Sequence, residues 1–185
     1  MKELFVLFFV CSFYTLIAQN NEWYKIKDLE AAYRIEFPSE PKKGKSDVST
    51  EKGLVTMHTY TYQSDSGDEN FIYMSSFSEY PNSFFPEGLN TLEKRNQVLE
   101  NAVNGAATNT KGTLISKSDM IFNGYNGTDA KISVDVSGYQ YIIRMKIILV
   151  GFKIYMTQVI YEKDNGDNLN LNRFFNSFEL LNVKM

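Results

Sequence analysis

Hydrophobic and polar residues alternate in short segments along most of the chain, and glycine, asparagine and aspartate separate these segments. A period of two residues is typical of strands in an antiparallel sheet with one buried face. The pattern first appears at 33–37, where two prolines follow it, and it returns at 43–50, 54–63 and 71–80. We expect the last three segments to pair as a meander, with a hairpin turn between the first two of them.

The period changes to three and four residues between 89 and 107, which predicts one long amphipathic helix. Gly88 and Asn90 are suited to the start of this helix, and Gly105 to its end. The apolar face of the helix is defined by Leu92, Arg95, Leu99, Ala102, Val103 and Ala106.

Alternation returns after the helix and predicts four more strands, at 114–122, 130–136, 139–150 and 152–161. The third of these is expected to be an internal strand, because one of its faces is unbroken and apolar. The fourth carries apolar residues on both faces. Both faces of the sheet must therefore be at least partly covered by other elements.

The C-terminal part of the chain predicts a short helix at 169–175 and a last strand at 177–181. In the short helix, Leu171, Phe174 and Phe175 fall on one apolar face. Together the elements predict an α+β fold. We expect an αβα sandwich built on a mostly antiparallel sheet of about six to eight strands, with one long helix and one short C-terminal helix.

Residues 1–18 have the features of a secretory signal peptide. Lys2 precedes an apolar run at 4–17, and the small residue Ala18 comes just before a polar stretch. The run is shorter than the roughly 20 residues that a membrane-spanning helix needs. We expect cleavage near Ala18 and export to the periplasm or the extracellular space. The only cysteine of the chain, Cys11, would be removed with this segment.

The predicted mature chain, 19–185, is expected to form a single domain, and its composition excludes several functions. It would contain no thiol and one histidine, His58, so cysteine nucleophiles and histidine-rich metal clusters are excluded. His58 lies in a strand pattern without a recognisable catalytic partner, and we predict no catalytic residue and no cofactor. The net charge is −3 and no long basic run occurs, so we expect no nucleic-acid partner. No membrane span is expected in the mature chain.

Two segments near the ends of the predicted domain carry a resemblance to a known group. Residues 35–41 read Ile-Glu-Phe-Pro-Ser-Glu-Pro, and residues 173–180 read Arg-Phe-Phe-Asn-Ser-Phe-Glu-Leu. With a long helix after three strands, these segments resemble the PsbP-like fold, which occurs in an extrinsic photosystem II subunit and in uncharacterised exported bacterial proteins. The resemblance covers about 33–181. It implies an αβα sandwich that binds other macromolecules, without a common active site, and with Phe37 and Phe178 as core anchors.

Two acidic turns contain hard oxygen ligands of the kind that calcium prefers. Asp65 and Asp68 belong to the first turn, and Asp164 and Asp167 to the second. Neither turn has the spacing of a helix–loop–helix calcium site, and ordinary turns use the same residue types. These four residues are therefore weak calcium candidates, and we predict no metal. The glycosylation pattern at 126–128 is interpreted as part of a turn.

The segment between the third strand of the meander and the long helix holds the main candidate for partner binding. Tyr80, Phe84 and Phe85 lie there beside two prolines, Pro81 and Pro86. If the two phenylalanines are exposed, they form an apolar patch of the kind that marks a binding site. In the alternative they pack over the sheet edge where the chain crosses to the helix.

Three functions follow from these patterns. The first is a non-enzymatic, exported protein-interaction module of the bacterial cell envelope. The second is a carrier or sensor of a small apolar ligand held between helix and sheet. The third is a hydrolase that uses carboxylates alone. A pocket between the long helix and the sheet would favour the carrier, a flat aromatic patch the module, and two buried carboxylates in one cleft the enzyme.

Overall fold

A computed structural model describes residues 22–50, 52–65 and 67–182. The predicted signal segment 1–18, with Cys11, lies outside the described residues. The elements, in chain order, are β1 (Tyr24–Asp28), β2 (Tyr33–Phe37), β3 (Lys42–Thr50), β4 (Gly53–Gln63), β5 (Asn70–Glu79), the 3-10 turn η1 (Asn82–Phe84), α1 (Leu92–Asn109), β6 (Thr113–Phe122), β7 (Tyr125–Val136), β8 (Tyr139–Val150), β9 (Lys153–Glu162), the 3-10 turn η2 (Lys163–Asn165), α2 (Leu169–Ser177) and β10 (Glu179–Leu180).

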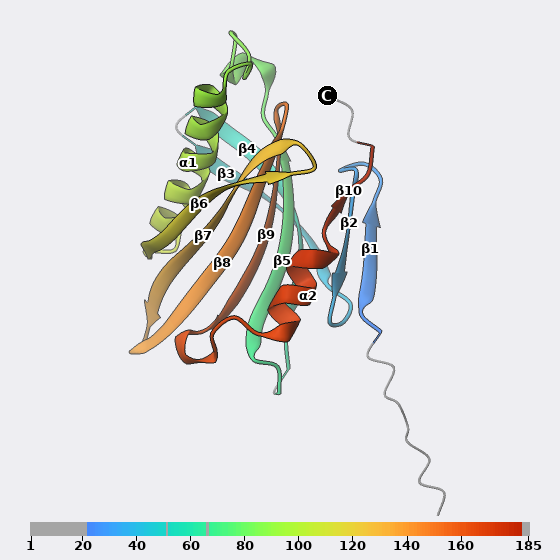
Figure 1. The fold of residues 1–185 in the computed structure, drawn as a ribbon, viewed down its shortest axis with the longest axis vertical. Coiled ribbons are helices and arrows are strands. Elements are labelled where there is room, and N and C mark those ends of the chain that lie inside the picture. The colour runs from blue at the N-terminus through green and yellow to red at the C-terminus, as the bar shows by residue number, and fades with distance from the viewer. Residues whose placement is uncertain (1–21, 51, 66, 183–185) are drawn as a thin grey trace, which may run out of the picture.

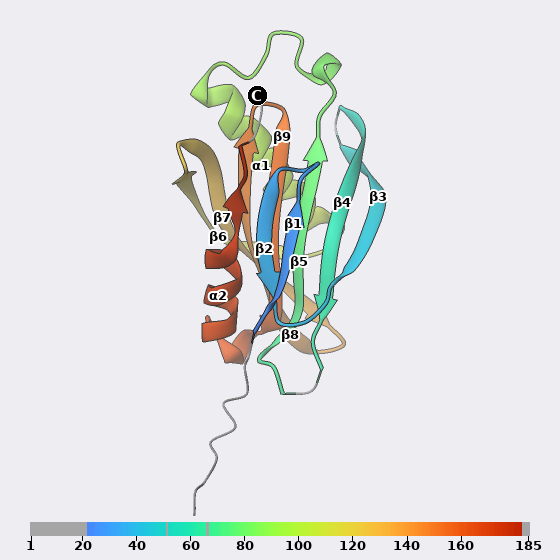
Figure 2. The ribbon, with the colours of Figure 1, turned by 90° about the vertical axis from the view of Figure 1, so that its right-hand side faces the viewer.

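The large sheet has seven strands in the order β3-β4-β5-β9-β8-β7-β6, and every neighbouring pair is antiparallel. A second sheet has the order β1-β2-β10. The small sheet and α2 lie on one side of the large sheet and α1 lies on the other, as Figures 1 and 2 show. The predicted α+β sandwich with one long and one short helix is confirmed, including the β3–β4–β5 meander.

The hairpin between β6 and β7 follows directly from its two turn residues. Asn123 and Gly124 have φ angles of 50° and 85°. Two successive residues with positive φ form the tight turn whose twist matches that of the flanking strands. The turn is therefore confined to these two residues, and residues 126–128 lie inside β7. The prediction of a turn there was wrong because the alternation in β7 begins with polar residues.

Helix α1 begins later than expected, because its cap is a residue that the sequence reading passed over. The side chain of Thr91 accepts a hydrogen bond from the backbone N–H of Lys94, which satisfies one of the free donors at the helix start. Gly105 lies inside the helix and does not end it. The buried residues of the helix are Val98, Leu99 and Val103, whereas Leu92 is exposed.

The small sheet is the part of the fold that the sequence did not reveal. Strand β1 was not predicted, and β2 pairs with it and with β10 rather than joining the large sheet. The first and last strands of the described chain thus meet through β2. This pairing places the two PsbP-like segments side by side, because one contains most of β2 and the other contains part of α2 and β10.

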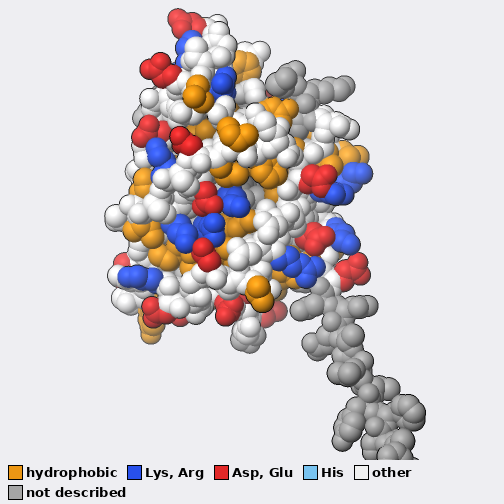
Figure 3. Space-filling model, viewed as in Figure 1, with side chains coloured by type: hydrophobic (Ala, Val, Ile, Leu, Met, Phe, Trp, Pro, Cys, Tyr) orange, Lys and Arg blue, Asp and Glu red, His pale blue; other side chains and the backbone are white. Residues whose placement is uncertain are grey.

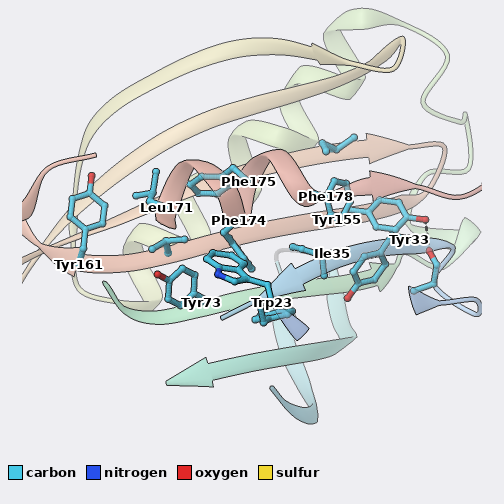
Figure 4. Close-up of a cluster of buried hydrophobic side chains, with 14 of the residues drawn as sticks. Trp23, Tyr33, Ile35, Tyr73, Tyr155, Tyr161, Leu171, Phe174, Phe175 and Phe178 are labelled. Carbon is cyan, nitrogen blue, oxygen red and sulfur yellow. Dashed lines mark hydrogen bonds between the residues drawn. The ribbon is translucent and has the colours of Figure 1, made fainter. Parts of the chain in front are cut away.

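The main core fills the space between the large sheet, the small sheet and α2. Figure 4 shows aromatic rings of β2, β5, β9 and α2 gathered in this core, together with those of Trp23 and Phe178. Phe174 of α2 packs edge-on against Phe37 and Tyr73, with ring centroids 5.1 and 5.3 Å away. Buried hydroxyls have partners here: that of Tyr33 lies 3.0 Å from the Ser75 hydroxyl. The predicted anchors Phe37 and Phe178 both belong to this core.

A second apolar cluster lies on the opposite face of the sheet, beneath α1. It combines Val98, Leu99 and Val103 of the helix with the α1-facing residues of β7 and β8. The helix contacts β6, β7 and β8. One long helix covers only part of this face of the seven-stranded sheet. The remaining strands are therefore not covered by α1 on this face.

Candidate functional site

A groove of about 910 Å³ lies between α1 and the part of the large sheet that α1 leaves uncovered. Strands β4, β5 and β9, with Ile147 of β8, form its floor, α1 forms one wall, and the tip of the β3–β4 hairpin forms the other. The opposite face of the same strands carries the main core. The groove therefore exists because the two cores are offset across the sheet.

The floor of the groove is apolar, with a central row of small residues. Ser78 of β5 lies between Met57 of β4 and Ile154 of β9 in the strand register, and Ser76 lies beside Met156. Both serines are buried, and they leave room that larger side chains would fill. Lining residues of the floor are Val55, Met57, Met74, Ser76, Ser78, Ile147, Ile154, Met156 and Gln158.

The helical wall is built from small residues that let the groove extend along α1. Ala102, Gly105 and Ala106 line it together with Val98. Above them the rim is polar and includes several asparagines and threonines of the same helix. An amphipathic helix with a narrow apolar face thus presents an apolar surface to the groove and a polar edge to water.

The three residues predicted to bind a partner close one end of the groove. Tyr80, Phe84 and Phe85 are half-buried and line it. The Phe85 ring stacks on Phe152 with centroids 6.0 Å apart and meets Tyr80 edge-on at 5.6 Å. Phe84 lies against Gly53 of the β3–β4 hairpin, where even a Cβ atom would be within 3.0 Å of the ring. The segment after β5 therefore reaches across the groove.

Charged groups stay at the rim of this closed end. Lys52 lies 4.9 Å from the centre of the Phe85 ring, a cation–π contact. Lys94 donates to Glu87, and this hydrogen bond and charge lower the pKa of the Glu87 carboxyl. Burial raises the pKa of the Tyr80 hydroxyl, so this group remains neutral at physiological pH. Among the described lining residues Glu87 is the one carboxylate, so they supply no carboxylate pair for a hydrolase.

The two acidic turns that were calcium candidates come together at the far end of the sheet. Asn70 and Asn168 exchange two hydrogen bonds of 2.9 Å, and Asn165 donates to the Glu69 carbonyl. Asp68 accepts from the Tyr73 hydroxyl at 2.8 Å. Asn168 also caps α2 by accepting from the N–H of Leu171. These contacts give the turns a structural role in joining β5 to α2.

The remaining candidates separate. Asp65 and Asp164 are exposed, while Asp167 takes part in an ion-pair network with Lys131 and Arg144. His58 lies in β4 with its ring 6.5 Å from that of Phe77. Within the described parts of the chain, no group of three or more His, Cys, Asp or Glu side chains could hold a metal ion.

The Asp167 network predicts a pH-dependent contribution to stability. Burial works against the charged form, but hydrogen bonds from Lys131 and Tyr161 and the charge of Arg144 hold the pKa of Asp167 below its ordinary value. A lowered folded-state pKa stabilises the fold above about pH 4, and this contribution is lost as the pH falls through the folded-state pKa. We expect D167N to lower the free energy of unfolding at pH 7 by less than about 1 kcal/mol, because the pair is partly exposed.

The check is urea unfolding of wild type and D167N at neutral and acidic pH. The difference between the two should shrink as the pH falls through the lowered folded-state pKa of Asp167, because the Asp167 carboxyl then loses its charge. D164N is the control, since Asp164 is an exposed acid in the same turn. A difference for D167N that persists in acid would assign the effect to packing instead of charge.

One face of the molecule carries both signs of charge. Basic and acidic side chains lie beside one another over the face seen in Figure 3. Arg144, for example, pairs with Asp129 at 3.0 Å and with Asp167 at 2.8 Å. This face therefore presents no field of a single sign.

No protein-family model matches the sequence, and no curated protein matches it. The fold is similar to that of cyanobacterial PsbP (CyanoP) from Synechocystis sp. PCC 6803, with 13% identity over 88% of this chain and 95% of that chain, and a TM-score of 0.56. A Pseudomonas aeruginosa protein of unknown function, PA94, gives a TM-score of 0.41 at 10% identity, over 77% of this chain and 85% of that chain.

The fold is therefore PsbP-like, as the segments 35–41 and 173–180 predicted. At this level of identity the likeness concerns the fold alone, and function has to be argued from the groove. In the described ranges of the chain, no helix is long and apolar enough to cross a membrane.

The groove floor is the feature that sequence reasoning missed. The pattern of 71–80 contained a signal, because Ser75, Ser76 and Ser78 interrupt an otherwise apolar and aromatic strand. The sequence could not tell which serines face a cavity. Ser75 pairs with Tyr33 in the core, while Ser76 and Ser78 face the groove.

Proposed function

We propose that this protein is a non-enzymatic binding protein that holds one small, mainly apolar molecule in the groove between α1 and the sheet. The observation that carries this proposal is the groove itself. Its volume of about 910 Å³ lies within the range of small-molecule sites, which are concave and mostly apolar with a few polar groups.

The lining suggests the chemistry of the ligand. Met57, Met74 and Met156 contribute flexible, polarisable side chains that adapt to irregular apolar shapes. The polar groups of the floor are few: Ser76, Ser78 and Gln158. A ligand with an extended apolar body and one or two hydrogen-bonding groups fits this arrangement better than a sugar or a nucleotide.

A carrier or sensor of such a molecule would act outside the cytoplasm if the predicted signal at 1–18 is used. Apolar molecules need a protein to cross an aqueous compartment, since their exposed surface costs free energy in water. The bacterial cell envelope is the compartment that the sequence predicts, and export remains part of the proposal.

The test is titration of the purified protein with the apolar dye N-phenyl-1-naphthylamine, followed by fluorescence. We expect saturable binding of about one dye per chain with a micromolar dissociation constant. Organic extraction of the protein from its native host, with mass spectrometry, would then identify the natural ligand. Dye binding that does not saturate, or that persists unchanged when the groove is blocked, would contradict the proposal.

Phe84 should contribute to ligand binding more than to stability, because it is half-buried at the closed end of the groove. We expect F84S to weaken dye binding about fivefold and to cost less than about 1.5 kcal/mol of unfolding free energy. Phe71 offers a matched control: it is 41% exposed, and its ring meets that of Tyr141, outside the groove lining. F71S should leave dye binding unchanged. Equal losses of binding in both variants would argue against a role for Phe84.

The envelope protein-interaction module expected from the sequence is the second candidate. The half-exposed aromatic end of the groove, formed by Tyr80, Phe84 and Phe85, would suit an apolar anchor from a protein partner. Crosslinking and pull-down of the exported protein would separate the two. A specific protein captured through this end, with no small molecule extracted, would favour the module.

A further inference from the structure

Strand β6 is a long, exposed edge of the large sheet. It is the last strand in the sheet order, and Figure 1 shows it at the outer side beside β7. Residues 113–119 are all exposed. Three apolar side chains of the strand are exposed: Leu114 at 37%, Ile115 at 53% and Ile121 at 67%. Unprotected edges of this kind pair readily with another strand.

The backbone of β6 shows which residues can form such a pair. Phe122 and Tyr125 close the tight turn, so their backbone groups face each other, and alternate residues back along the strand also face β7. The Thr128 hydroxyl accordingly donates to the Ser118 carbonyl at 3.1 Å. Lys117, Asp119 and Ile121 then direct their N–H and C=O groups outward, away from β7.

The side chains of β6 are complementary to themselves. In an antiparallel pair of two β6 strands related by a two-fold axis at Ser118, each Lys117 lies opposite Asp119 of the other copy. The same register places Ile115 opposite Ile121. Opposite charges and β-branched side chains are both favourable as cross-strand pairs. A bulge at Ile115 ends the regular ladder, so this outer pair would be a side-chain contact.

The other edge of the sheet provides an internal comparison. Strand β3 contains the same tripeptide, Lys45-Ser46-Asp47, at an edge. At the positions that correspond to the two isoleucines, β3 carries Lys43 and Ser49. Lysines on an edge strand disfavour pairing, and polar flanks bury no apolar surface. The apolar contribution is therefore specific to β6.

We propose that two copies of this chain associate through β6 in an antiparallel, two-fold arrangement that continues the large sheet from one copy into the other. The interface is isologous: the same strand serves both copies, and closure at two avoids open-ended assembly. The groove lies toward β3 and β4, near the edge of the sheet opposite to β6. Each copy therefore keeps its own groove accessible. The association does not depend on the groove having a ligand.

The test is a charge exchange measured by sedimentation velocity over a range of protein concentrations. D119K places lysine opposite lysine across the two-fold axis and should weaken the dimer about tenfold or more. The double variant K117D/D119K restores opposite charges in the same register and should restore the dimer. Lys117 also pairs with Glu100 of α1 at 3.5 Å, so all variants are made in an E100Q background.

D47K is the matched control, because it makes the same change in the same tripeptide of β3. D47K should leave the mass of the assembly in solution unchanged. A chain that stays monomeric up to about 1 mM, or a double variant that stays as monomeric as D119K, overturns the proposal. So does a D47K variant that dissociates the dimer as strongly, since the contact would then be at β3. Dye binding in the same variants should be unaffected, which separates this outcome from that of the groove.

Discussion

Replacing Ser78 with phenylalanine is expected to abolish binding of an apolar ligand while the protein stays folded. Ser78 lies on the groove floor between Met57 and Ile154, and its side chain lines the groove beside α1. A phenyl ring there would occupy the volume that the ligand needs. Aromatic residues are well tolerated in strands, and the groove has room for the ring, so overpacking of the core is avoided.

For S78F we expect at least a tenfold loss of affinity for N-phenyl-1-naphthylamine, with a change in unfolding free energy below about 1.5 kcal/mol. S133F is the control, because Ser133 is also a serine within a strand of the large sheet but is partly exposed and lies on β7, outside the groove lining. It should bind dye as wild type does. If S78F still binds dye normally, the groove is not the binding site.

Replacing Phe174 with alanine is expected to have the largest effect on stability. The side chain is fully buried and touches the rings of Phe37, Tyr73 and Phe175, so it joins α2 to both sheets. Removal of a buried phenyl ring loses its transfer free energy and leaves a cavity. We expect F174A to lower the free energy of unfolding by about 3–5 kcal/mol and the midpoint temperature of thermal unfolding by roughly 10 °C.

Urea denaturation monitored by circular dichroism measures this loss. F71A provides the comparison, because Phe71 is 41% exposed and packs on one ring, so its loss should stay below about 1.5 kcal/mol. Similar losses for the two variants would mean that α2 contributes little to the core. Any F174A protein that remains folded should still bind dye, since the main core and the groove lie on opposite faces of the sheet.

The regular elements were predictable because their signals are local. Alternation identified β2 to β9 with boundary errors of a few residues, and the apolar face of α2 was correct in all three anchors: Leu171, Phe174 and Phe175. Strand β1, Tyr-Lys-Ile-Lys-Asp, is short and has no buried residue, and it was missed. The start of α1 was misplaced because Thr91 and Asn90 are both acceptable caps, and only the backbone geometry chooses between them.

The candidate binding residues were also predictable only in part. The sequence singled out Tyr80, Phe84 and Phe85 from their setting among prolines, and the structure places them together at the groove end. The sequence left two alternatives for these residues, an exposed patch or packing over the sheet edge. The half-buried position that they occupy depends on contacts with Phe152 and Gly53, which are remote in sequence.

Strand periodicity, turn residues and helix faces are properties of neighbouring residues, so the sequence alone was enough to establish an α+β sandwich and a chain poor in catalytic side chains. The groove depends on something else. It arises because α1 packs over β6 to β8 while α2 and the small sheet cover the other face, and this offset is set by which apolar surfaces complement each other after the chain has folded. Packing between distant segments has no local signature, so the tertiary structure alone reveals where the sheet stays uncovered.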